Sequence, residues 1–253
     1  MILIPAIDLK DKKVVRLYKG KFDNTTFYAL TPVEAAKQWI TMGAMWLHVV
    51  DLDGAQTGTM TNLNVIQEIV TEAKKSNVSV QVGGGIRSRD IVKELLDLGI
   101  SRVVIGTKAV EMQTLIEQSL MIGDILRTYG SDSVAVSIDC LNGYVTRRGW
   151  TEVSDVKGLV LAKGLEEVGV RTIIYTDISK DGTLHGPNFN DVLNILNQVN
   201  IDIIASGGIS SLEDVRRLSN LMSKNKKYLW GAITGKAIYE RKLDFKQAID
   251  ILK

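Results

Sequence analysis

The sequence VGGGIRS at residues 82–88 returns as ASGGISS at residues 205–211, 123 residues further along the chain. Each copy follows a β-branched run and opens a stretch with the apolar spacing of an amphipathic helix. Glycines at such a turn let backbone N–H groups approach an anion, and the helix N-terminus behind them favours negative charge. Two such loops in matched positions predict a duplicated half-barrel with one phosphate site in each half. The expected ligand therefore carries two phosphates.

A second pair of segments repeats in the same order. IPAIDLKDKKVVR at residues 4–16 aligns with AVSIDCLNGYVTR at residues 135–147, which places Asp8 over Asp139. A long internal repeat indicates that the chain is built from copies of one structural unit, so it decides the architecture. The repeat predicts two half-barrels of approximately residues 1–130 and 131–253, within a single domain that spans residues 1–253.

Strand-like and helical stretches alternate along the whole chain. The strand-like runs are rich in Val and Ile without polar alternation, as expected for strands buried on both faces. Eight strand–helix units joined by short loops predict an α/β fold, a TIM (β/α)8 barrel with the two-fold half-barrel repeat. The strands are expected at residues 2–7, 46–50, 78–82, 102–105, 134–138, 172–176, 203–206 and 228–233, and helices at residues 32–42, 62–75, 88–98, 114–129, 155–168, 189–198 and 211–220.

Composition limits the partners of this protein. The formal net charge of +2 and the absence of a dense basic stripe argue against nucleic-acid binding. The single cysteine, Cys140, excludes an internal disulfide and a cysteine metal cluster. No apolar run approaches the roughly 20 residues of a membrane span. We expect a cytoplasmic protein without a membrane or metal partner, and a monomer, because a closed barrel has no free sheet edge.

Asp8 and Asp139 end the first and fifth predicted strands. Active sites of such barrels lie at the carboxyl ends of the strands, so the two carboxylates are expected on opposite sides of one mouth. Paired carboxylates suit proton transfer when one is the base and the other is held neutral as the acid. The alternative is that each carboxylate only hydrogen-bonds backbone in its own loop.

Seven motifs together resemble the phosphoribosylformimino-aminoimidazole-carboxamide ribotide isomerase family (HisA) of histidine biosynthesis. They are IPAIDL, VRLYKG, WLHVVDLDGA, VGGGIRS, RRGW, YTDISKDGTLHGPN and ASGGISS, which span nearly the whole chain. The resemblance implies an intramolecular aldose–ketose isomerase. Its reaction is an Amadori rearrangement of an N-glycosylic aminoaldose to the phosphoribulosyl aminoketose, on a substrate with a phosphate on each of two ribose units. It also implies that no cofactor is needed.

The resemblance implies roles for individual residues. Asp8 would be the proton acceptor and Asp139 the proton donor, with Asp181 as an alternative acid, and Thr176 would hydrogen-bond near the reacting centre. Trp150 would stack on the imidazole carboxamide, and Arg16 and Arg148 lie on loops that could close over the ligand. The remaining substrate- or phosphate-binding residues expected are Gly84, Gly85, Gly106 and Thr107 for one phosphate, Gly207, Gly208, Gly235 and Lys236 for the other, and Gly182.

His48 and the pair Ser210 and Glu213 are interpreted as structural, whereas Trp230 is a departure from the family pattern. His48 lies inside the second predicted strand, where a hydrogen-bonded core imidazole is expected. Trp230 is bulky for a last barrel strand. Ser210, with Glu213 three residues on, predicts a capping box for the helix at residues 211–220.

Other functions stay open at this point. The sister barrel, the cyclase subunit of imidazole glycerol phosphate synthase, shares the fold and both phosphate sites. Its first strand typically ends Cys-Leu-Asp, whereas this chain has Ala6-Ile7-Asp8. A dual-substrate isomerase would also act on phosphoribosylanthranilate in tryptophan biosynthesis. A non-catalytic phosphosugar-binding barrel would keep the glycine loops and bind the ligand without turnover.

Overall fold

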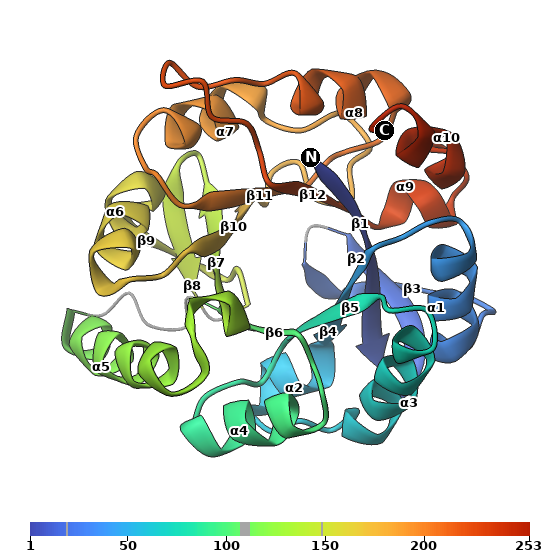
Figure 1. The fold of residues 1–253 in the computed structure, drawn as a ribbon, viewed down its shortest axis with the longest axis horizontal. Helices are drawn as coiled ribbons and strands as arrows, with labels where there is room; N and C mark the ends of the chain where they lie inside the picture. The colour runs from blue at the N-terminus through green and yellow to red at the C-terminus, as the bar shows by residue number, and fades with distance from the viewer. Residues whose placement is uncertain (19, 107–111, 148) are drawn as a thin grey trace.

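The computed structural model describes residues 1–18, 20–106, 112–147 and 149–253. Within these residues, eight parallel strands form a closed ring with helices around it (Figure 1). Each ring strand pairs with the next, and the last pairs with the first, so the ring has no free edge. The predicted TIM barrel is confirmed. Its strands are β1 (Ile2–Lys10), β4 (Trp46–Asp51), β5 (Ser79–Gly83), β6 (Arg102–Gly106), β7 (Val134–Leu141), β10 (Thr172–Asp177), β11 (Asp202–Ser206) and β12 (Gly231–Thr234).

The helices cover the outside of the ring. Every predicted helix is present, with ends that differ from the prediction by at most three residues. None of the described helices is long and apolar enough to cross a membrane. The helices are α1 (Pro32–Thr41), α2 (Leu52–Thr57), α3 (Leu63–Lys74), α4 (Arg89–Asp97), α5 (Met112–Tyr129), α6 (Gly158–Val168), α7 (Phe189–Leu196), α8 (Leu212–Ser219), α9 (Lys236–Tyr239) and α10 (Phe245–Asp250), with a 3-10 turn at Ser131–Ser133.

The capping box predicted at Ser210 and Glu213 is wrong by one residue. The N-cap of α8 is Ser211, and its partner is Asp214, whose carboxylate accepts the backbone N–H of Ser211 at 3.0 Å. Ser210 also donates to Asp214, so the single carboxylate satisfies both residues. Glu213 is exposed and takes no part in the box.

Two antiparallel hairpins extend the barrel strands at the mouth. β2 (Lys13–Tyr18) and β3 (Lys21–Phe27) extend β1, and β8 (Tyr144–Arg147) and β9 (Glu152–Lys157) extend β7. Residues 155–157, predicted as the start of a helix, are the end of β9. Both hairpins follow the first strand of a predicted half, which supports the half-barrel repeat; the repeat itself stays a prediction.

Strand alternation divides the apolar residues into two layers. One layer packs between strands and helices and includes Ile7, Leu9, Ile138 and Cys140. The other fills the inside of the ring with Ile4, Ala6, Val104, Ala135, Ile174, Ile204 and Ile233. Successive side chains of a strand point to opposite faces. A strand residue whose two sequence neighbours pack against the helices therefore points into the ring.

Candidate active site

The predicted carboxylates lie on the inner face of the ring, at its carboxyl end. Ile7 and Leu9 both pack toward the helices, so Asp8 between them points inward. Ile138 and Cys140 place Asp139 inward by the same argument. Thr176 lies beside Asp139, because the two residues are partners in the β10–β7 register. The structure therefore brings the three residues to one mouth.

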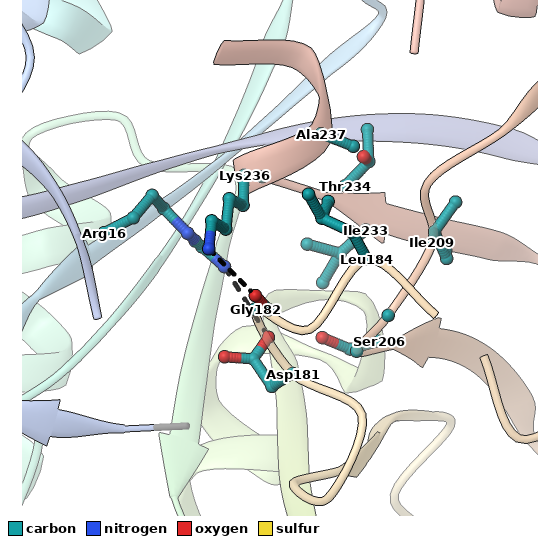
Figure 2. Close-up of a pocket in the computed structure, with 13 residues that line it drawn as sticks. Arg16, Asp181, Gly182, Leu184, Ser206, Ile209, Ile233, Thr234, Lys236 and Ala237 are labelled. Carbon is teal, nitrogen blue, oxygen red and sulfur yellow. Dashed lines mark hydrogen bonds and ion pairs between the residues drawn. The ribbon is translucent and has the colours of Figure 1, made fainter. Parts of the chain in front are cut away.

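Arg16 joins two carboxylates across this mouth. Its Nη1 lies 2.8 Å from Oδ2 of Asp8, and its Nη2 lies 3.6 Å from Oδ1 of Asp181. All three side chains are between 11% and 13% exposed. Arg16 reaches Asp8 because β2 folds back on β1 with Asp8 opposite Val15. Figure 2 shows Arg16 and Asp181 pointing toward one another from opposite sides of the pocket.

Burial changes the proton affinity of both acids. It raises the pKa of Asp8 to about 6, and Asp181 raises it as well, while Arg16 opposes the shift. Burial also raises the pKa of Asp181 against the pull of Arg16, and the neighbouring Asp139 adds to the rise. Burial lowers the pKa of Arg16, but Asp8 and Asp181 more than compensate and leave it raised. The site thus holds one fixed cation between two acids whose pKa values are both raised by burial.

Asp139 has a different environment. Its Oδ1 accepts the hydroxyl of Ser137 at 2.9 Å, and its Oδ2 accepts the indole N–H of Trp150 at 3.0 Å. Trp150 reaches it with a φ of +71°, a conformation that side chains other than glycine rarely adopt. A Cβ on Gly20 would lie 2.2 Å from Cε3 of Trp150, so the glycine leaves room for the indole.

A pocket beside Asp181 gathers residues predicted for the second phosphate (Figure 2). Gly207 and Gly208 both have positive φ, and a Cβ on Gly208 would lie 2.4 Å from the carbonyl oxygen of Gly186. The Lys236 ammonium donates to the carbonyl of Gly182 at 3.1 Å. The pocket lining includes the predicted residues Arg16, Asp181, Gly182, Gly207, Gly208, Gly235 and Lys236.

The loop predicted for the first phosphate has the same local geometry. Gly84 and Gly85 have positive φ, and a Cβ on Gly84 would lie 2.1 Å from the carbonyl oxygen of Asp51. Ser88 caps α4 as Ser211 caps α8, each through its side-chain oxygen to the N–H three residues on. Gly106 ends β6, and among the described residues no atom outside its chain neighbours would lie within 4 Å of a Cβ there. The predicted Thr107 and Arg148 lie outside the described residues.

Sequence reasoning missed Ser137 and the bridging position of Arg16. Ser137 lies two residues before Asp139 on the same strand, so strand alternation gives the signal that could have found it. Arg16 was predicted on a loop that closes over the ligand, but it lies on β2. Among the described residues, no group of three or more His, Cys, Asp or Glu side chains could hold a metal ion.

Comparison with known proteins places this chain in a family. Residues 2–244 match the family model described as "Histidine biosynthesis protein". Three relatives carry the name 1-(5-phosphoribosyl)-5-((5-phosphoribosylamino)methylideneamino)imidazole-4-carboxamide isomerase. The protein from Carboxydothermus hydrogenoformans is 50% identical over 100% of this chain and 99% of its own length. Those from Clostridioides difficile and Acetivibrio thermocellus are each 44% identical, over 98% and 100% of this chain and 97% and 100% of their own lengths.

Proposed function

The chain belongs to the histidine biosynthesis protein family, as one of its phosphoribosylformimino-aminoimidazole-carboxamide ribotide isomerases, and from this membership we propose how its residues catalyse the reaction. The relatives' printed name describes a substrate with two phosphoribosyl groups. Two glycine loops before capped helices suit two phosphates, because backbone N–H groups and a helix N-terminus both favour an anion. In this proposal Gly84 and Gly85 bind one phosphate, and Gly207 and Gly208 bind the other.

Asp8 acts as the base. The C1′–O bond of the sugar ring breaks, its electrons pass to the ring oxygen, and that oxygen takes a proton from an acid. The lone pair of the nitrogen on C1′ forms a C1′=N double bond as the ring opens. Asp8 then removes the proton from C2′; the C–H electron pair forms the C1′–C2′ double bond of the enolamine, and the π electrons of C1′=N return to nitrogen. Tautomerisation moves a proton to C1′ and leaves the ketone at C2′. A carboxyl with a pKa of about 6 is well matched to this task, because a general base works best near the operating pH.

Asp181 is the better-supported acid in this conformation. Its raised pKa favours the protonated form that an acid needs, and it faces Asp8 across Arg16. Asp139, first expected as the proton donor, has both carboxylate oxygens occupied as acceptors by Ser137 and Trp150. Oδ2 of Asp139 is free of the indole only when Trp150 moves away. The proposal keeps Asp139 as the acid of a rearranged state in which Trp150 stacks on the imidazole carboxamide.

The observation that carries this mechanism is the placement of Asp8 and Asp181 on either side of Arg16, beside the glycine pocket. The test is turnover of the purified bis-phosphorylated aminoaldose, measured alongside phosphoribosylanthranilate. Turnover of the first substrate alone supports a histidine-pathway isomerase. Turnover of both substrates would establish the dual-substrate alternative. Binding without turnover would favour the cyclase or the non-catalytic binding protein instead.

Assembly and location complete the proposal. The ring itself has no free strand edge, and the only edges among the described strands are those of the hairpin strands β3 and β9. We expect a monomer in solution. The single cysteine, Cys140, is buried, and burial raises the pKa of its thiol to about 12, so it is an inert core residue. A cytoplasmic location fits a chain that uses no disulfide. Light scattering during gel filtration tests the monomer.

A further inference from the structure

A row of polar side chains crosses the inside of the barrel below the mouth. His48, Gln81 and Arg102 are partners in register on the adjacent strands β4, β5 and β6. The flanking residues Leu47, Val49, Val80, Val82 and Val103 all pack toward the helices, so these three side chains point inward. Gln81 is fully buried and Arg102 is 3% exposed, in a layer otherwise filled by apolar residues. Neither residue has a role in the proposed acid–base steps.

The hydrogen bonds along this row run in one direction. Nε and Nη2 of Arg102 both donate to Oε1 of Gln81, at 3.1 Å and 2.7 Å. A guanidinium only donates, so the oxygen of the Gln81 amide must face Arg102 and its NH2 must face the other way. That NH2 lies 2.9 Å from Nδ1 of His48. Nδ1 therefore accepts, and the proton of a neutral His48 is on Nε2.

Further contacts hold the Arg102 guanidinium in the orientation that donates to Gln81. Its guanidinium lies over the rings of both Trp46 and Trp230, at 4.4 Å and 4.6 Å from their centroids, and the two rings meet edge to face. Nη1 donates to the hydroxyl of Thr172 at 3.3 Å. The two aromatic rings stabilise a cation that forms no ion pair within the described part of the chain. The bulk of Trp230, unexpected for a last barrel strand, is accounted for by this contact.

His48 lies one inward-facing layer below the proposed base, on the neighbouring strand β4. The β1–β4 register pairs Ala6 with His48 and, two residues on, Asp8 with Val50. His48 keeps accessible surface, whereas Leu47 and Val49 on either side have none. Burial, together with the positive charges of Arg16 and Arg102, lowers the pKa of His48 to about 3. His48 is therefore neutral at every pH at which the protein works.

We propose that Gln81 and Arg102 are positioning residues that hold His48 as the neutral Nε2–H tautomer, and so give the mouth a fixed, uncharged hydrogen-bond donor beneath Asp8. This inference rests on the proposed function, in which Asp8 removes the C2′ proton. The donor serves the C2′ oxygen, which becomes the ketone. A neutral imidazole suits this role, because it can donate to oxygen without placing another charge beside the base.

The tautomer can be read directly by NMR. The chain has only two histidines, His48 and His185, so long-range proton–nitrogen spectra of histidine-labelled protein are simple, and a His185→Gln variant assigns them. In the wild type we expect His48 protonated on Nε2 alone, with no titration between pH 5 and 8. Gln81→Glu places an acceptor at Nδ1, so the proton is expected to move to Nδ1. Arg102→Gln frees the Gln81 amide to turn and is expected to give a mixture of tautomers.

Kinetics separates positioning from packing. Gln81→Glu is expected to lower kcat by about tenfold or more, with KM within about threefold of the wild type, because the lost donor acts in the reacting state. The matched control is Gln198→Glu, the same change at an exposed glutamine whose side-chain oxygen accepts a hydrogen bond from Lys163. It is expected to leave the tautomer and kcat unchanged.

Two results would overturn the inference. One is a wild-type His48 that titrates between pH 5 and 8 or carries its proton on Nδ1. The other is a folded Gln81→Glu protein in which the proton has moved to Nδ1 and kcat is unchanged. The tautomer measurement needs no turnover, so an inactive wild type would contradict the proposed function while the spectra still decide the positioning.

Discussion

The carboxylate of Asp8 accepts a hydrogen bond of 2.8 Å from Arg16, and the same guanidinium lies 3.6 Å from Asp181. Asp8 comes from a barrel strand, Arg16 from the hairpin that follows it, and Asp181 from a loop on the other side of the mouth. One cation therefore limits the proton affinity of both acids, against the effect of their burial. Arg16 sets the pH range in which the base and the acid can work together.

Replacing Arg16 with methionine should move the pH profile. Arg16 lowers the pKa of Asp8, so its loss raises that pKa above about 6, and a base with a higher pKa becomes ionised only at higher pH. The acidic limb of kcat/KM against pH, expected near pH 6 in the wild type, should shift upward by at least about half a pH unit. The inflection is compared rather than the height, since Arg16 also contacts the pocket. Arg216→Met, on the exposed face of α8, should leave the limb in place; an unmoved limb in Arg16→Met would contradict the role of Arg16.

Asp8→Asn should abolish most turnover while the fold persists. Removing a general base costs about 10²- to 10⁴-fold in kcat, and substrate affinity should change little. The free energy of unfolding gives a second measurement. The folded pKa of Asp8 is raised, so its contribution to stability is complete below pH 3.8 and is lost as pH rises through about 6. Urea unfolding at pH 4 and pH 7.5 should therefore show a smaller loss of stability with pH in Asp8→Asn than in the wild type. Full activity per folded molecule would leave Asp8 with a structural role only.

The positions and contacts of Asp8, Arg16 and Trp150 show which parts of this site can be predicted from the sequence and which cannot. The position of Asp8 followed from a β-branched run that ends at a carboxylate, because barrel strands are buried on both faces and open at one end. The contact of Arg16 depends on the register of β1 with β2, which is set by a turn in which Asp11 and Lys12 both have positive φ. Asp11 and Lys12 are not typical of such a turn, which is why the first hairpin was missed. The second hairpin was missed although its turn, Asn142-Gly143, has positive φ at both residues and is a common hairpin sequence. The contact of Trp150 with Asp139 depends on another positive φ at a residue that gives no sign of it.

Comparing Asp181→Asn with Asp139→Asn should identify the acid. An acid must be protonated to work, so its loss should remove the basic limb of the kcat/KM profile. Asp181→Asn is expected to flatten that limb and to lower kcat by about 10²-fold or more, because burial and Asp139 favour its protonated form. Asp139→Asn should keep the limb if Asp139 serves only as the partner of Trp150. The reverse pattern would assign the proton to Asp139 and would require Trp150 to leave it during the reaction.

Trp150 should contribute to binding through its ring and through its N–H separately. Trp150→Phe keeps an aromatic face but loses the donor to Asp139, and Trp150→Ala loses both. If the ring stacks on the imidazole carboxamide, KM should rise by about tenfold or more in Trp150→Ala, since stacking on a base contributes about 1–3 kcal/mol. Trp150→Phe should show a rise several times smaller. Equal values of KM in the two variants would mean that the ring does not contact the substrate.

A side chain at the glycine pairs should weaken substrate binding more than it slows the chemical step. A Cβ on Gly208 would lie 2.4 Å from a backbone oxygen, that of Gly186, and Gly208 has a φ of +84°. Gly208→Ala must therefore shift the loop and turn its N–H groups away from the phosphate. We expect KM for the bis-phosphorylated substrate to rise by about tenfold or more, with a smaller fall in kcat.

Gly164→Ala is the matched control for that change. Gly164 lies within α6, and no atom outside its helix turn would lie within 4 Å of a new Cβ. Alanine is the better helix former, so this variant should raise the free energy of unfolding by about 0.5–1 kcal/mol and leave KM unchanged. Calorimetry and initial-rate kinetics on the two variants separate loop geometry from a general effect of adding a methyl group. A Gly208→Ala protein with wild-type KM would remove the loop at residues 205–211 from the phosphate site.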